Sequence, residues 1–192
     1  MRVTSAETFL SPTDLTSYLA CPHLAMLELR TARGELARPQ RNEDAELLAK
    51  KGIAHETAYL DRLRSEGRGV REIELERASG DGFEVAANAT RAAIHEGVEV
   101  IYQGVLIDGR WRGQADFLER TQDGSYEVLD TKLAHRAKPS YVLQLSLYSD
   151  ALAKVQRKEP ARMHVLLGSG ERQSFRPRDF DAYTRRVQRR LE

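Results

Sequence analysis

The sequence has only one cysteine, Cys21, among its 192 residues, so no disulfide bond can form within the chain. No apolar run approaches the roughly 18 to 20 residues that a membrane-spanning helix needs. The N-terminal segment has neither the apolar stretch nor the small-residue cleavage site of a secretory signal. These absences exclude a disulfide scaffold and a membrane span, and they predict a cytoplasmic protein.

The sequence also lacks an excess of charge of either sign. The 30 Lys and Arg residues nearly balance the 29 Asp and Glu residues, and the formal net charge is +1. Domains that coat nucleic acid by charge alone usually carry a clear basic excess, so the sequence disfavours that class. An enzyme that acts on nucleic acid is not excluded, because it needs carboxylates where the chemistry occurs and basic residues only along the approach.

Helical patterns dominate the first part of the chain. Ser11, followed directly by a proline, predicts the start of a first helix, which is kinked or interrupted at Pro22. A second helix is predicted over residues 43–67, and its apolar spacing places Leu48, Ile53, Ala54, Leu60 and Leu63 on the buried side.

Strand patterns dominate from residue 98 onward. Alternating apolar and polar residues predict five strands, over residues 98–107, 110–120, 125–134, 163–168 and 172–177. A last helix, residues 178–192, shows no stop signal, which suggests a natural protein that continues beyond this chain. We expect a single α/β domain over residues 1–192, with a mixed, mainly antiparallel central sheet flanked by helices.

The hairpin between residues 110 and 134 carries two acids whose positions depend on the length of its loop. If residues 122–124 form a three-residue loop, Thr121 pairs with Ser125, and counting back places Asp116 directly opposite Asp130. Directly opposed residues share a sheet face, with Cβ atoms about 4.5 to 5.5 Å apart. A two-residue loop would instead put the two acids on opposite faces.

The residue two positions after the second acid is a lysine. The strand period of two puts Asp130 and Lys132 on one face, so that this face holds two carboxylates and an ammonium. Opposed like charges destabilise a sheet, but a hard cation such as Mg²⁺ or Mn²⁺ reverses the sign of that effect. The alternative is a solvated hairpin face with an incidental Asp–Lys pair; the apolar neighbours of both residues favour the cation site.

Three short motifs resemble a known family. They are G-x-A-D-F at residues 113–117, L-D-T-K-L at residues 129–133 and Q-L-S-L-Y at residues 144–148. Their order and spacing resemble the core of RecB-type PD-(D/E)xK nucleases, in particular a bacterial RecB family nuclease group related to CRISPR-associated RecB-like exonucleases. The likeness runs from about residue 17 to the final helix. It implies a restriction-endonuclease-like core and Mg²⁺- or Mn²⁺-dependent hydrolysis of DNA, as an exonuclease acting on single strands or ends.

The resemblance also implies roles for individual residues. Its metal ligands are His55, Asp116 and Asp130, and its catalytic residues are Asp116, Asp130, Lys132, Gln144 and Tyr148. Residues four apart share a helix face, so Gln144 and Tyr148 can both point toward a strand-borne site, although such a pair also suits a helix that merely covers a sheet. A lone helical histidine such as His55 is more often structural or exposed than a ligand.

Other residues follow from the same resemblance or from their place in the sequence. In relatives with an iron–sulfur cluster, one cysteine precedes the nuclease core, and Cys21 matches it; the other three thiolates of a cluster are absent here. Cys21 is therefore either a cluster ligand in a longer protein or a plain buried cysteine. Longer relatives also carry a downstream ribonuclease-H-like domain. The candidate DNA phosphate contacts are Arg110, Arg112, Arg136 and Lys138.

Two other functions fit the same sequence. A catalytically idle module that binds DNA ends would show saturable, salt-sensitive binding without turnover. An interaction domain of a DNA repair or defence assembly would leave the acidic hairpin as plain surface, with no response to divalent ions.

Overall fold

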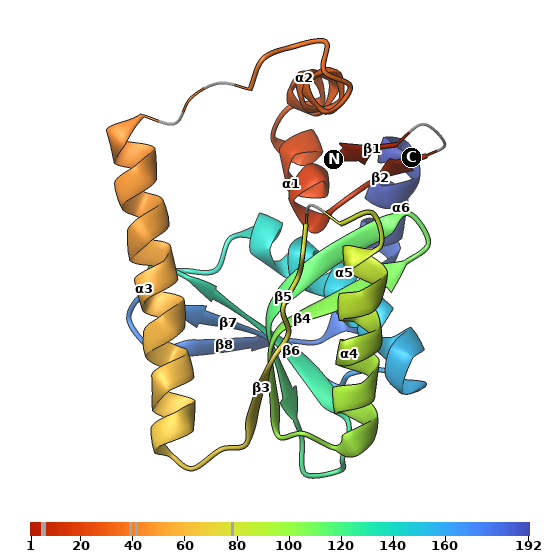
Figure 1. Cartoon of the computed structure of the whole chain (residues 1–192). Helices are drawn as coiled ribbons and strands as arrows, with labels where there is room; N and C mark the ends of the chain where they lie inside the picture. Colours follow the sequence, from red (N-terminus) through yellow and green to blue (C-terminus); the bar gives the residue numbers. More distant parts are fainter. Residues whose placement is uncertain (5–6, 39, 41, 78) are drawn as a thin grey trace.

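The computed structural model describes residues 1–4, 7–38, 40, 42–77 and 79–192. A six-stranded sheet forms its centre, in the order β3-β4-β5-β6-β7-β8 (Figure 1). The strands are β3 (Val70–Glu72), β4 (Val100–Asp108), β5 (Trp111–Arg120), β6 (Tyr126–Lys132), β7 (Met163–Leu167) and β8 (Arg172–Phe175). The pairs β3–β4 and β6–β7 are parallel and the other neighbours antiparallel. The predicted mixed, mainly antiparallel sheet is confirmed.

Helices cover both faces of this sheet. Helix α3 (Glu43–Ser65) lies on one face, and helices α4 (Gly82–Glu96) and α5 (Pro139–Gln156) lie on the other (Figure 1). The larger core cluster joins α4 and α5 to one face through side chains such as Tyr126 and Val128, and a second cluster joins α3 to the opposite face through Phe117 and Leu129. None of the described helices is both long enough and apolar enough to span a membrane.

The remaining elements pack at one end of the molecule. They are β1 (Arg2–Val3), β2 (Thr8–Phe9), α1 (Pro12–Ala20), α2 (Pro22–Ala32), η1 (Pro177–Asp179) and α6 (Asp181–Leu191). Helix α1 begins with the predicted serine cap: Ser11 and Asp14 form a reciprocal capping box. The predicted break before Pro22 is confirmed, because Cys21 ends α1 and begins α2. The two-residue strands β1 and β2 pair with each other and were not predicted.

Helix α3 corrects one expectation. Leu48 and Ile53, predicted on its buried side, are 62% and 64% exposed. Only its C-terminal half packs on the sheet, through Tyr59, Leu60 and Leu63, while the N-terminal half extends past the strands (Figure 1). Leu60 and Leu63 are buried as predicted. Apolar residues recur along the whole helix, so their pattern alone could not tell which half would be covered.

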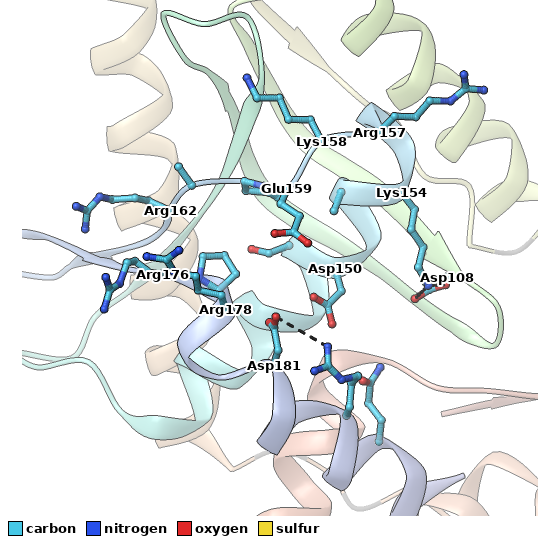
Figure 2. Close-up of a pocket in the computed structure, with 17 residues that line it drawn as sticks. Asp108, Asp150, Lys154, Arg157, Lys158, Glu159, Arg162, Arg176, Arg178 and Asp181 are labelled. Atoms are coloured by element: carbon cyan, nitrogen blue, oxygen red, sulfur yellow. Dashed lines mark hydrogen bonds and ion pairs between the residues drawn. The ribbon is translucent and has the colours of Figure 1, made fainter.

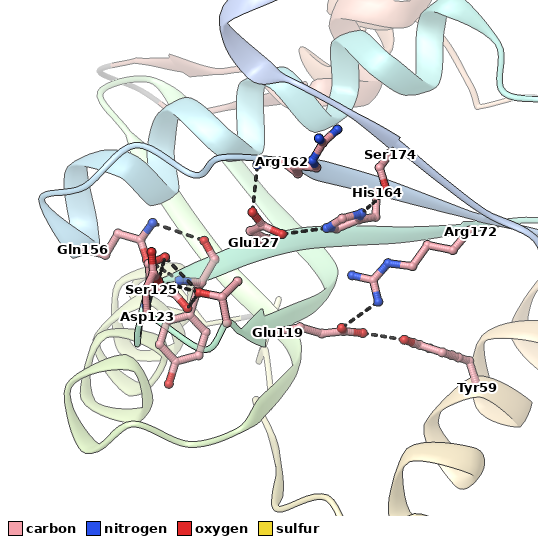
Figure 3. A network of polar contacts seen from close by, with 12 residues as sticks. Tyr59, Glu119, Asp123, Ser125, Glu127, Gln156, Arg162, His164, Arg172 and Ser174 are labelled. Carbon is pink, nitrogen blue, oxygen red and sulfur yellow. Dashed lines mark hydrogen bonds and ion pairs between the residues drawn. The ribbon is translucent and has the colours of Figure 1, made fainter.

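A ladder of polar side chains crosses the sheet beside α3 (Figure 3). Glu119 of β5 pairs directly with Glu127 of β6, an arrangement that would repel if both acids lacked partners. Arg172 donates to Glu119 at 2.9 Å, and the Tyr59 hydroxyl donates to the same carboxylate. His164 Nε2 lies 2.8 Å from Glu127. The two opposed acids are therefore each hydrogen-bonded, and the bond from Tyr59 to Glu119 joins α3 to β5.

Candidate active site

The acidic hairpin has the predicted register. The Thr121 amide donates to the Ser125 carbonyl at 2.7 Å, and Gly124 has the left-handed φ of 82° that a three-residue loop needs. The strand pairing continues to Phe117 opposite Leu129. One further step places Asp116 level with Asp130, so the three-residue loop, and not the two-residue alternative, is confirmed.

The two strands separate at the level of these acids. Instead of a backbone pair, Asp116 Oδ2 accepts hydrogen bonds from the Thr131 amide at 2.8 Å and from its hydroxyl at 2.9 Å. The alternation of faces along β5 is broken here as well, because Ala115 packs in the cluster with α4 and α5, whereas Phe117 packs in the cluster with α3. Asp116 thus stands at an irregular point between the two faces.

Asp130 is a buried acid with an incomplete set of donors. It is only 1% exposed, which excludes the solvated hairpin face. Its Oδ1 accepts a hydrogen bond of 3.4 Å from Gln144 Nε2, and its Oδ2 is ion-paired with Lys132 Nζ. Apart from Lys132, Oδ2 has no polar partner among the described residues. A buried carboxylate with one cationic partner and one long hydrogen bond can accept a further positive partner.

The charges around Asp130 do not cancel. Burial raises the pKa of Asp130, and the nearby Asp116 carboxylate raises it further, while Lys132 opposes both effects. Burial acts to lower the pKa of Lys132, but Asp130 and Asp116 outweigh burial and raise it, so the amine stays protonated. One ammonium therefore faces at least two carboxylates, and the pocket favours an added cation.

A third acid, Glu56 of α3, reaches the same place and was missed in the sequence. Burial raises the pKa of Glu56, and Asp116 raises it further, which places the two carboxylates near each other. Gln103 Nε2 donates to Glu56 Oε1. The only sequence signal for Glu56 was its position directly after His55. That signal is weak, because a helix turns by about 100° per residue and adjacent side chains point in different directions.

The oxygen donors at this site fit a hard divalent cation. Mg²⁺ and Mn²⁺ prefer carboxylate oxygens, and the buried Asp130 Oδ2 has Lys132 as its one polar partner among the described residues. Within the described ranges, however, no three His, Cys, Asp or Glu side chains already stand close enough together to form a ligand group. The ligand set His55, Asp116 and Asp130 thus stays a prediction.

His55 is the predicted ligand that lies apart. Its Nε2 is 3.5 Å from the Leu166 carbonyl on β7, and it hydrogen-bonds neither Asp116 nor Asp130. Glu56 points toward β4 instead of β7, and it is hydrogen-bonded there to Gln103. His55 and Glu56 therefore flank the acidic hairpin from two sides of the same helix turn.

Helix α5 brings its two predicted residues to the sheet. Gln144 contacts Asp130, and the Tyr148 hydroxyl donates to the Gln114 carbonyl at 2.9 Å. Burial and the nearby Asp130 and Asp116 raise the pKa of Tyr148, so this hydroxyl remains a donor. A Cβ at Gly113 would lie 2.6 Å from the Tyr148 ring, which explains the glycine of the G-x-A-D-F motif.

With this geometry in view, comparison with known proteins identifies the family. The sequence model described as the PD-(D/E)XK nuclease superfamily matches residues 24–192. The chain belongs to this superfamily. Asp130 and Lys132 have the D-x-K spacing that the superfamily's name contains.

Solved structures resemble this nuclease-superfamily chain only distantly. A candidate exonuclease from Eubacterium rectale is 11% identical, with a TM-score of 0.49, and the match covers 100% of this chain and 83% of that one. The protein SSO0001 is 12% identical, with a TM-score of 0.43 and coverage of 99% and 77%. No curated protein matches the sequence. These values are too low to transfer an activity.

The predicted phosphate contacts of this nuclease-superfamily chain differ in their surroundings. Arg136 and Lys138 are exposed on the segment between β6 and α5, and Lys138 and Lys132 both lie near the Tyr141 ring. Arg110 is exposed at the β4–β5 turn, roughly 20 Å along the strand from Asp116. Arg112 already stacks 3.6 Å from the centre of the Phe9 ring and approaches Glu84, so a phosphate would have to displace these contacts.

Cys21 is exposed, which corrects the expectation that it could be a plain buried cysteine. It is the only cysteine of the chain, and it forms the junction between α1 and α2. A four-thiolate cluster cannot form from this chain alone.

A cleft of about 910 Å³, shown in Figure 2, is lined by none of the proposed site residues. It runs between α5 and the η1–α6 segment, and its lining includes Asp150 of α5 and Asp181 of α6. Burial raises the pKa of Asp150 to about 6, and the Asp181 carboxylate contributes in the same direction; Arg185 and Lys154 oppose it. Asp150 is therefore charged at neutral pH at a cost to the folded state.

We expect Asp150→Asn to stabilise the protein at pH 8 by about 1 kcal/mol, after allowing for solvent screening. The folded-state pKa lies above the ordinary value of 3.8, so the cost is present above pH 6 and disappears as pH falls toward 4. Thermal melting of the wild type and the variant between pH 8 and pH 4 measures this. A stability gain that is equal at all pH values would contradict the titration of Asp150.

Proposed function

We propose that this chain is a divalent-metal-dependent deoxyribonuclease that hydrolyses phosphodiester bonds, as a RecB-like exonuclease acting on single strands or DNA ends. The observation that carries the proposal is the buried carboxylate of Asp130, which lies near the Asp116 carboxylate and has the single ammonium of Lys132 as its cationic partner. Membership of a nuclease superfamily supports the same chemistry. We keep the prediction that residues 1–192 form one nuclease domain.

Each residue of the site has a proposed task. Asp116 and Asp130 would hold Mg²⁺ or Mn²⁺, with His55 or Glu56 as a further donor from α3. Such a cation supplies charge neutralisation at the scissile phosphate and lowers the pKa of a water molecule. The Lys132 ammonium, which stays protonated, would stabilise negative charge that develops on the phosphate oxygens.

Helix α5 would keep this arrangement rigid. Gln144 donates to Asp130 Oδ1 while Lys132 contacts Oδ2, so the two residues together would fix the orientation of this carboxylate. Tyr148 ties α5 to the β5 backbone at Gln114, two residues from Asp116. Arg136 and Lys138, exposed beside the site, are the best-placed candidates for contacts with the DNA backbone.

An idle DNA-binding module is the second candidate. The solvated-surface form of the interaction-domain hypothesis loses support, because Asp130 is buried. A buried acid that faces a second carboxylate costs stability, and an idle fold would have little reason to keep it. Turnover in the presence of metal distinguishes the nuclease from the idle module.

The test is incubation of the full chain with end-labelled linear DNA and with circular single-stranded DNA, in Mn²⁺, in Mg²⁺ and in EDTA. We expect metal-dependent shortening of linear single strands, no loss of circles, and no degradation by Asp130→Ala or Lys132→Ala. Equal degradation by all three proteins would indicate a contaminant. Salt-sensitive binding without degradation would favour the idle module. Cleavage of circles would replace the exonuclease with an endonuclease.

A further inference from the structure

Gln103, in the middle of β4, has a backbone conformation that strands do not normally contain. Its φ is +56°, and among the described residues only Arg157 is another non-glycine with a positive φ. Left-handed backbone costs free energy in residues with a Cβ, and such residues gather at functional sites. Pairing along β4 and β5 is recorded on both sides of Gln103 but not at it: Tyr102 pairs with Phe117 and Gly104 with Ala115. Gln103 thus stands level with Asp116.

The unusual φ changes the direction in which the Gln103 side chain points. In a regular strand it would share the face of Ile101 and Val105, which pack in the cluster with α4 and α5. Instead, its amide donates to Glu56 of α3, on the opposite face. The hydroxyl of the adjacent Tyr102 lies close to the same carboxylate. Adjacent side chains in a regular strand point to opposite faces of the sheet. Tyr102 and Gln103 can both approach Glu56 because this alternation of faces is broken between them.

Gln103 therefore acts on Glu56 at the point where the acids meet. The Gln103 amide donates to Glu56 Oε1, and the Asp116 carboxylate lies near the same side chain. The Gln103 carbonyl also accepts a hydrogen bond of 3.3 Å from Gln114, the residue whose own carbonyl accepts from Tyr148. One strained residue thus connects α3, β4 and β5 around Asp116.

We propose that Gln103 is a positioning residue of the cation site: its left-handed backbone turns the carboxamide toward α3, where it holds the Glu56 carboxylate beside Asp116. The inference rests on the proposed function in that it assumes a divalent cation at these acids. Gln103 touches neither substrate nor cation in this role. It acts through Glu56, and its loss would leave that acid free to turn away from Asp116.

The test compares Gln103→Gly and Gln103→Asn with the wild type, by calorimetric titration of the full chain with Mn²⁺ in the absence of DNA. Glycine accepts the positive φ without strain but lacks the amide, so we expect unchanged or higher thermal stability and Mn²⁺ affinity about tenfold weaker. Asparagine tolerates left-handed backbone and keeps a carboxamide, so we expect it to restore part of the affinity even if the glycine variant folds poorly.

Arg157→Gly is the matched control, because Arg157 has φ +54° at the end of α5, away from the acids. It should raise thermal stability without changing Mn²⁺ affinity. Wild-type affinity in Gln103→Gly, or no recovery with asparagine, would overturn the positioning role while leaving the proposed nuclease intact. A wild type that binds no Mn²⁺ would overturn both.

Discussion

Asp130→Asn is expected to abolish nuclease activity and, at the same time, to make the metal-free protein more stable. Activity should fall about a thousandfold or more, because the variant loses an anionic oxygen that would hold the cation. The gain in stability has a separate cause. The pKa of Asp130 is raised by burial and by Asp116, so at neutral pH the charged carboxylate costs free energy that a neutral amide avoids.

The direction of this effect follows from the titration. An acid whose folded-state pKa lies above its ordinary value destabilises the folded state at higher pH, and the cost disappears as pH falls. We expect the metal-free variant to melt a few degrees higher than the wild type at pH 8, where 1 kcal/mol corresponds to about 2 to 4 °C for a protein of this size. Adding Mn²⁺ should raise the melting temperature of the wild type but not of Asp130→Asn.

Asp61→Asn provides the control, because Asp61 lies on α3 with a side chain that is 67% exposed. It should change neither activity nor the response to Mn²⁺. A metal-free Asp130→Asn protein that melts below the wild type would show that Asp130 serves mainly as a structural partner of Lys132. Retained activity would remove Asp130 from the proposed site.

Lys132→Met is expected to have the opposite effect on stability. Lys132 is the only ammonium paired with Asp130 among the described residues, and its removal leaves that buried acid facing Asp116 uncompensated. Breaking a buried ion pair typically costs about 3 to 5 kcal/mol, and the partial exposure of the Lys132 side chain places this case at about 2 to 3 kcal/mol. Activity should fall at least a hundredfold, since the charge that faces the phosphate is lost.

Divalent metal should then rescue the stability of this variant but not its activity. A cation between Asp116 and Asp130 replaces the missing positive charge, so the Mn²⁺-induced rise in melting temperature should be larger in Lys132→Met than in the wild type. The matched control is Lys154→Met, whose exposed ion pair with Asp108 predicts a change within about 0.5 kcal/mol. An equal Mn²⁺ response in Lys132→Met and the wild type would argue against a cation at these two acids.

Much of the fold was accessible from the sequence because its signals are local. The serine cap of α1, the break before Pro22 and the three-residue loop ending at Gly124 each depend on the chemistry of a few adjacent residues. The loop fixed the register of β5 and β6, and the register in turn placed Asp116 level with Asp130. A short stretch of chain thus predicted the centre of the candidate site.

Other features depend on contacts between distant segments. Glu56 and Gln103 are 47 residues apart, and no spacing rule connects a helix residue with a strand residue at that separation. The exposed Leu48 and Ile53 have the same cause, because only the position of α3 on the sheet decides which half is covered. His55 likewise lies near Leu166, a neighbour that the sequence could not indicate.

The sequence by itself indicated the class of fold, the register of the acidic hairpin and the placement of Asp130 beside Lys132. The last two follow from side-chain periodicity and turn chemistry within about twenty residues. Only the tertiary structure decided that Asp130 is buried, that Glu56 approaches Asp116, and that β4 is distorted at Gln103. The physical reason is that burial, repulsion between charges and backbone strain are set by whichever distant segments pack together.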